Sequence, residues 1–121
     1  MIAALLLFAA ASADPVAGTW EGSSLCQVKS SPCHDEHVIY RIAMTGAQSY
    51  RLDAYKVVGG QEQFMGPIDM KFDPALHQLR GAAGGARVSA TLLLTMKGDH
   101  LSGSMTLSDG KLFRLIEVTK H

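Results

Sequence analysis

The chain has 121 residues, 47% of them hydrophobic, and this length fits a single globular domain. Eleven Lys and Arg residues balance eleven Asp and Glu residues, so the formal net charge is zero. Binding to nucleic acid or to an anionic membrane surface needs a basic face, and the composition offers no sign of one.

The first thirteen residues are uncharged and apolar, and they end in Ala11-Ser12-Ala13 just before Asp14. A small residue on each side of a variable one is the cleavage pattern of a secretory signal peptide. The apolar run is about ten residues, half of what a membrane-spanning helix needs, so we expect no membrane anchor. We predict a signal peptide at 1–13, a single domain at 14–121 and a periplasmic or secreted location. This segment lacks the usual initial Lys or Arg, so we expect the natural start to lie upstream of Met1.

The two cysteines, Cys26 and Cys33, are separated by six residues. In an oxidising compartment this spacing favours a disulfide that joins the end of one strand to the start of the next. Closing so short a loop contributes about 2 to 3 kcal/mol to stability on the chain-entropy estimate. The alternative is a redox or metal pair, but the Cys-x-x-Cys spacing of redox proteins is absent.

Potential metal ligands are densest at Cys33-His34-Asp35-Glu36-His37. Zinc could bind His34 and His37 together with both cysteines. However, a three-residue spacing on a strand places the two imidazoles on opposite faces, and a disulfide consumes both thiolates. We therefore favour a polar loop that enters a strand, and we predict no metal site and no cofactor.

From Thr19 onward, apolar residues alternate with polar ones, and no long stretch has the spacing of a helix. This pattern predicts an almost entirely β structure. In the three clearest strands, the side chains predicted to point inward are Val38, Tyr40, Ile42 and Met44 in His37 to Met44; Val88, Ala90, Leu92, Leu94 and Met96 in Arg87 to Met96; and Leu101, Gly103, Met105 and Leu107 in Leu101 to Leu107.

Turn residues divide this pattern into eight strands. They lie at 45–48, 59–61, 73–75, 84–85, 97–99 and 109–110, and each segment contains the Gly, Pro or Asp that a tight reversal needs. Short connections favour antiparallel pairing of consecutive strands, and eight twisted strands tend to curl until the first meets the last. We therefore predict an all-β, eight-stranded antiparallel up-and-down barrel; the alternative is a sandwich of seven or eight strands.

The last strand, 111–118, contains Arg114 on the same face as Leu112, Ile116 and Val118. If that face points inward, the guanidinium group needs hydrogen bonds and a stacking partner, and Trp20 on the first strand is the expected partner. The alternative places Phe113 and Leu115 inward and leaves Arg114 in solvent.

Gly18, Trp20 and Arg114 carry a resemblance to the calycin group, which includes lipocalins, fatty-acid-binding proteins and avidin-like barrels. In that group, a Gly-x-Trp in the first strand and an Arg near the end of the last strand close one end of the barrel. The chain also resembles small lipocalin-like periplasmic proteins of unassigned activity, and in size it resembles bacterial periplasmic inhibitors of metalloproteases. It is short for a lipocalin and has no predicted helix after the barrel.

No constellation typical of catalysis is present: there is no Gly-x-Ser-x-Gly and no phosphate-binding glycine loop before a helix. We therefore expect a monomeric binding protein, not an enzyme. A barrel of eight strands either has a filled interior or holds one small ligand. The residues expected to line a cavity for a small apolar ligand are Tyr40, Ile42, Leu52, Met70, Leu92, Leu94, Met105 and Ile116.

Two alternatives remain beside this interpretation. The inward methionines (Met44, Met65, Met70, Met96 and Met105) are typical of plain core packing. The second alternative is an interaction module that binds or inhibits an envelope protein through a loop end such as 59–66 or 30–37.

Overall fold

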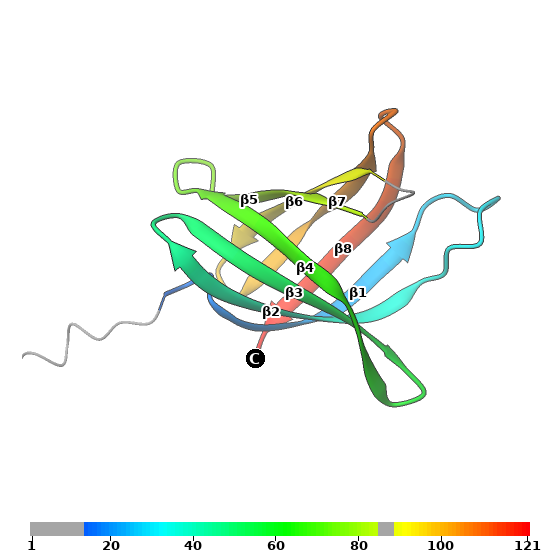
Figure 1. Ribbon diagram of the computed structural model, residues 1–121, viewed down its shortest axis with the longest axis horizontal. Coiled ribbons are helices and arrows are strands. Elements are labelled where there is room, and N and C mark those ends of the chain that lie inside the picture. Colours follow the sequence, from blue (N-terminus) through cyan, green and yellow to red (C-terminus); the bar gives the residue numbers. More distant parts are fainter. Residues whose placement is uncertain (1–13, 85–88) are drawn as a thin grey trace, which may run out of the picture.

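A computed structural model describes residues 14–84 and 89–121 and shows a closed antiparallel barrel of eight strands (Figure 1). Each strand pairs with the next along the chain, and the first pairs with the last. The predicted all-β, up-and-down barrel is therefore confirmed, and the sandwich is excluded. The strands are β1 (Gly18–Cys26), β2 (Glu36–Gly46), β3 (Ser49–Val58), β4 (Gln61–Asp73), β5 (Gln78–Ala83), β6 (Ala90–Lys97), β7 (His100–Leu107) and β8 (Leu112–Lys120).

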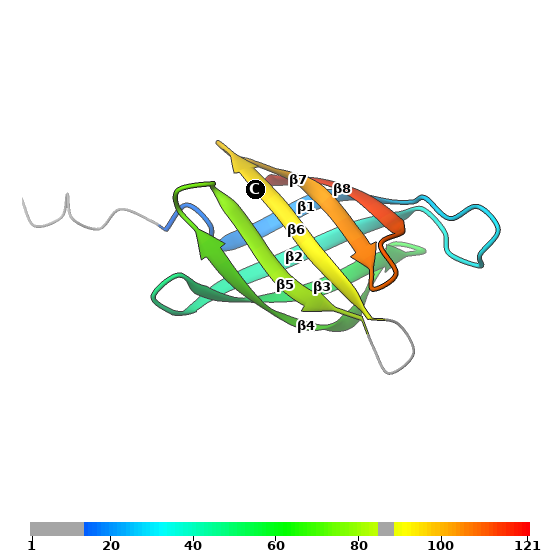
Figure 2. The same ribbon diagram turned by 90° about the horizontal axis from the view of Figure 1, so that it is seen from above.

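The up-and-down topology gives the barrel two ends (Figure 2). We call one the open end, which carries the β1–β2, β3–β4, β5–β6 and β7–β8 connections. The other, the closed end, carries the remaining three turns and both ends of the described chain. The predicted signal peptide, 1–13, and the predicted inward Val88 lie outside the described residues.

Large apolar side chains fill the barrel towards the closed end. Because successive strand residues point to opposite faces, the residues that enter this core alternate with outward-facing ones along the strands. The completely buried members include Trp20, Leu52, Met70, Leu79, Leu92, Leu94, Leu101 and Ile116. Apolar side chains fill this part of the interior.

Two of the methionines predicted to point inward, Met44 and Met65, are exposed. Met44 lies near the end of β2 with 52% of its surface accessible. Strand β1 pairs with β2 only as far as Gly18 opposite Ile42, so the β2–β3 hairpin beyond that point projects past its neighbour. The alternation of apolar and polar residues continues beyond Ile42, but β1 no longer lies beside this part of β2.

The segment that precedes β1 covers the closed end. Val16 is completely buried, and its carbonyl oxygen accepts a hydrogen bond of 2.9 Å from the Trp20 indole nitrogen. The carboxylate of Asp14 accepts bonds from the Tyr50 hydroxyl (2.7 Å) and from the backbone N–H groups of Val16 and Ala17. These contacts hold 14–17 across the barrel as a plug.

Strand pairing between β1 and β8 corrects one predicted contact. Trp20 lies opposite Lys120, whereas Arg114 lies opposite Cys26 at the other end of β1. Arg114 does point inward and is only 8% exposed, but its predicted stacking on Trp20 is wrong. Lys120 takes that place, with its ammonium nitrogen 5.4 Å from the centre of the Trp20 ring. Gly18 makes room for it, since a Cβ there would lie 2.7 Å from Lys120 Cε.

The barrel wall is incomplete near the open end, between β4 and β5. These strands pair only from Met70 opposite Gly81 to Asp73 opposite Gln78. Beyond Met70, β4 follows β3 away from β5, as the lower right of Figure 1 shows. The exposed edge of β4 includes Pro67, which has no N–H group, and a bulge, and both features discourage pairing with another chain.

Candidate functional site

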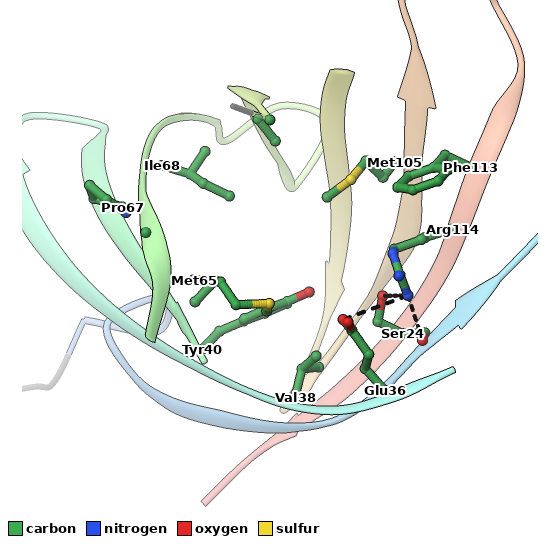
Figure 3. Close-up of a pocket in the computed structure, with 14 residues that line it drawn as sticks. Ser24, Glu36, Val38, Tyr40, Met65, Pro67, Ile68, Met105, Phe113 and Arg114 are labelled. Atoms are coloured by element: carbon green, nitrogen blue, oxygen red, sulfur yellow. Dashed lines mark hydrogen bonds and ion pairs between the residues drawn. The ribbon is translucent and has the colours of Figure 1, made fainter. Parts of the chain in front are cut away.

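A cavity of about 320 Å³ occupies the open end of the barrel, and we call it the open-end cavity (Figure 3). Its wall is mostly apolar, with a polar group on one side. The residues that line it are Ser24, Glu36, Val38, Tyr40, Ala54, Met65, Gly66, Pro67, Ile68, Ala83, Gly84, Met105, Phe113 and Arg114.

Local sequence explains why this half of the barrel is hollow. The inward positions here include Ala54 and Ala83, where the closed end has Leu and Met. A bulge in β4 lies opposite Ala54 and Tyr55, and Gly66 within it has φ +119°, which an L side chain rarely adopts. The bulge turns Met65 into the cavity beside Tyr40, as Figure 3 shows.

A second bulge, in β8, shapes the opposite wall. Arg114 pairs with Met105 and Leu112 pairs with Thr106, so Phe113 is the extra residue between them. Both Phe113 and Arg114 consequently reach the cavity, and the guanidinium carbon lies 5.2 Å from the centre of the Phe113 ring.

Arg114 is anchored at one of its nitrogens. Nη1 donates to the Ser24 carbonyl (3.1 Å), the Ser24 hydroxyl (3.3 Å) and the His34 carbonyl (3.0 Å). The same nitrogen lies 3.6 Å from Glu36 Oε1, and Glu36 Oε2 lies 4.0 Å from the ammonium nitrogen of Lys56. A buried guanidinium group is costly unless it is bonded, and these contacts explain how Arg114 is held on the inner face.

Tyr40 is 3% exposed, and its phenol extends across the cavity towards the side that carries Glu36 and Arg114 (Figure 3). Burial raises the pKa of Tyr40 well above its usual range, the charge of Glu36 raises it further, and the charge of Arg114 opposes the change. The hydroxyl group therefore keeps its proton at physiological pH and can donate a hydrogen bond.

The structure divides the predicted cavity residues into two groups. Tyr40 and Met105 line the open-end cavity. The remaining six belong to the packed core instead: Ile42, Leu52, Met70, Leu92, Leu94 and Ile116. The alternating pattern identifies which residues point inward, but it does not tell how high along the barrel axis each one lies.

Several cavity residues were missed from the sequence, among them Glu36, Ala54, Ala83 and the residues Gly66 to Ile68 that follow the bulge in β4. A usable signal did exist, because Ala54 and Ala83 are small residues at inward positions on strand halves that precede open-end turns. Small residues at such positions leave space that the large residues elsewhere fill.

The predicted disulfide is confirmed. Cys26 and Cys33 are bonded, with their Cα atoms 5.9 Å apart, and they close the β1–β2 loop. The zinc alternative that needed both thiolates is therefore excluded. Near this loop the Asp35 carboxylate accepts a bond of 2.8 Å from the Cys26 N–H group.

The two histidines of the former zinc alternative have separate surroundings. His34 contributes its carbonyl oxygen to Arg114, whereas the His37 side chain binds Glu21 on the outer surface. Glu21 also contacts His121 Nε2 at 2.7 Å. Among residues 14–84 and 89–121, no group of three or more His, Cys, Asp or Glu side chains is arranged to hold a metal ion.

Comparison with known proteins adds no family. No protein-family model matches the chain, and no curated protein matches it. The eight-stranded antiparallel barrel is compatible with a lipocalin-like fold, and the calycin assignment stays a prediction. In the part of the chain that the structure describes, no helix has the length and apolar character needed to cross a membrane.

Proposed function

We propose that this protein is exported and binds a small apolar molecule in the open-end cavity. The observation that carries the proposal is the cavity itself, which measures about 320 Å³ and is lined mainly by apolar side chains. Sites for small ligands have volumes of roughly 300 to 1,000 Å³, whereas a water molecule occupies roughly 30 Å³. The space is therefore large enough for a compact organic molecule.

Export is supported by the disulfide and by the position of the plug. A disulfide persists in the periplasm or outside the cell and is rare in the cytosol. Cleavage after Ala13 would remove none of the contacts that Asp14, Val16 and Ala17 make at the closed end. Neither observation tests the signal peptide, so mass measurement of the exported protein is needed to find its first residue.

A displacement experiment tests ligand binding. The neutral dye N-phenyl-1-naphthylamine gains fluorescence in apolar surroundings, so we expect saturable binding to the wild-type protein. Ala54→Leu places extra carbon atoms in the space that the dye would occupy. Forcing extra atoms into an occupied site costs about 1 to 3 kcal/mol, so binding should weaken at least roughly tenfold. Ala43→Leu, the same change at an exposed position of β2, is the matched control.

Native mass spectrometry of the purified protein complements the dye. A retained small molecule that is lost in Ala54→Leu and kept in Ala43→Leu supports the proposal. Equal dye binding by both variants would show that the dye binds elsewhere, and the proposal would then be abandoned.

The β3–β4 hairpin supports a second candidate function, an interaction module for an envelope protein such as a periplasmic protease. Val58, Phe64 and Met65 are 49%, 53% and 43% exposed on this hairpin, which projects from the open end (Figure 1). Phe64 lies beside Tyr55 on the outer face of the hairpin, with the ring centres 5.2 Å apart, and exposed apolar side chains that adjoin one another often mark a protein contact. Capture of an envelope hydrolase by the wild-type protein, but not by Phe64→Ser, would favour this function.

A further inference from the structure

We propose that the ligand of the open-end cavity carries a single negative charge, such as a carboxylate, on a head group that binds Arg114 and Tyr40. This inference rests on the proposed function and adds the chemical class of the ligand. Its apolar part would lie against the opposite wall, on Val38, Ile68 and Met105.

The first argument is the unused donor capacity of Arg114. Every hydrogen bond and ion pair of its guanidinium group found in the described residues is made by Nη1. No buried side-chain nitrogen or oxygen in this part of the chain lacks a hydrogen-bond partner. Nε and Nη2 make no hydrogen bond with the described residues, so these residues do not fully enclose them. Because Arg114 lines the cavity, both nitrogens are available to a molecule inside it.

The second argument is the charge balance. Arg114 and Lys56 both approach the carboxylate of Glu36, one at each oxygen. Two cations thus share one anion, and among the described residues that line the cavity, Glu36 and Arg114 are the only charged ones. A single anionic group beside Arg114 would complete the balance, whereas a cationic ligand would add to the excess of positive charge.

The third argument is the Tyr40 hydroxyl. It makes no hydrogen bond within the described residues, and the same reasoning shows that it is accessible from the cavity. A protonated phenol and the N–H groups of Nε and Nη2 can all donate, and a carboxylate accepts several donors at once. The polar side of the cavity therefore offers hydrogen-bond donors to the head group of a ligand. Its acceptor, the Glu36 carboxylate, already faces the cations of Arg114 and Lys56.

The test compares three probes that share one apolar tail: octanoate, octanol and octylamine. Each displaces N-phenyl-1-naphthylamine from the wild-type protein at neutral pH. A hydrogen bond to a charged group contributes about 1.5 to 3 kcal/mol, so we expect octanoate to bind roughly tenfold or more tightly than octanol, and octylamine most weakly.

Variants assign this preference to the two residues. Arg114→Gln should bring octanoate to the affinity of octanol, because the hydrogen bond between two charged groups is lost. Tyr40→Phe keeps the shape of the core residue and should weaken octanoate more than octanol, so it also tests the inference if Arg114→Gln fails to fold. Arg80→Gln removes an exposed cation from the outer face of β5 and is the matched control for net charge.

The possible outcomes separate the two proposals. Equal binding of octanoate and octanol, or tightest binding of octylamine, overturns the anionic head group and leaves the apolar ligand standing. If no probe displaces the dye and the dye itself does not bind, the proposed function fails and the inference fails with it. An octanoate preference that Arg114→Gln and Tyr40→Phe both keep places the anion elsewhere and also overturns the inference.

Discussion

The ammonium group of Lys120 lies over the indole ring of Trp20 and also donates to the carbonyl oxygens of Asp14 (3.3 Å) and Pro15 (3.0 Å). One side chain of the last strand therefore joins the first strand and the plug. Because β1 and β8 are also paired along their length, this contact strengthens the closure of the barrel where the core is densest.

Replacing Lys120 by Met keeps the aliphatic part of the side chain and removes the charge. We expect the free energy of unfolding to fall by about 1 to 2 kcal/mol, from the lost cation–π contact and the two lost hydrogen bonds. Urea unfolding followed by circular dichroism measures this change. Lys97→Met, at an exposed position of β6, should change stability by less than about 0.5 kcal/mol; equal losses in both variants would contradict the assignment.

Asp14 makes the plug sensitive to acid. Burial by itself would raise the pKa of Asp14, but hydrogen bonds from Tyr50, Val16 and Ala17, together with the charge of Lys120, outweigh it and hold the pKa below its ordinary value of 3.8. A carboxyl group with a lowered folded-state pKa contributes stability above its unfolded pKa and loses it as the pH falls through the folded value. We expect unfolding free energy to decline below about pH 4.

Asp14→Asn provides the comparison for this acid dependence. The variant should be less stable at pH 7 and should lose less stability than the wild-type protein on going to acid. The lowered pKa of Glu21, which arises mainly from its hydrogen bond to His37, contributes to the acid dependence that remains. An acid profile identical in wild type and Asp14→Asn would show that Asp14 is not responsible.

The disulfide is expected to support both stability and the cavity. The double variant Cys26→Ser, Cys33→Ser should lower the free energy of unfolding by about 2 to 3 kcal/mol, because the unfolded chain gains the conformational entropy that the disulfide removes. It should also weaken octanoate binding more than octanol binding, because His34 next to Cys33 supplies a carbonyl oxygen to Arg114. Dye displacement and urea unfolding on the same samples measure the two effects separately.

Trp20 offers a spectroscopic check on the location of the ligand. It is the only tryptophan and is completely buried at the closed end, so its emission should be that of an apolar site and resist quenching by iodide. A ligand in the open-end cavity does not reach it, since Trp20 is absent from the cavity wall. We expect octanoate to leave the emission unchanged. A shift in the emission wavelength would indicate that the ligand binds near the closed end, in contradiction to the proposed site.

The sequence was sufficient to predict the strands and turns because their signals are local. Alternation along β6 and the turn at Asp109 and Gly110 depend only on neighbouring residues, and both are found as expected. The pairing of Cys26 with Cys33 could be predicted for the same reason, since the two residues are close in the chain.

Features that depend on distant strands were harder to predict. The register between β1 and β8 is set by two segments almost a whole chain apart, and it places Lys120, in place of Arg114, beside Trp20. The cavity similarly depends on where β4 leaves β5 and on bulges at Met65 and Phe113. A residue pattern of period two carries no information about these offsets.

The plug and the last strand bring the two termini of the described chain to a common place, with Lys120 in contact with Asp14 and the His121 N–H bonded to the Thr19 carbonyl at 2.9 Å. A tether at either of these two positions would hold the barrel with its open end directed away from the point of attachment. The protein can therefore be attached to a surface through residue 121 without blocking access of a ligand to the open-end cavity. A short peptide that links residue 121 to residue 14 would allow new termini at another turn, which gives a circular permutant.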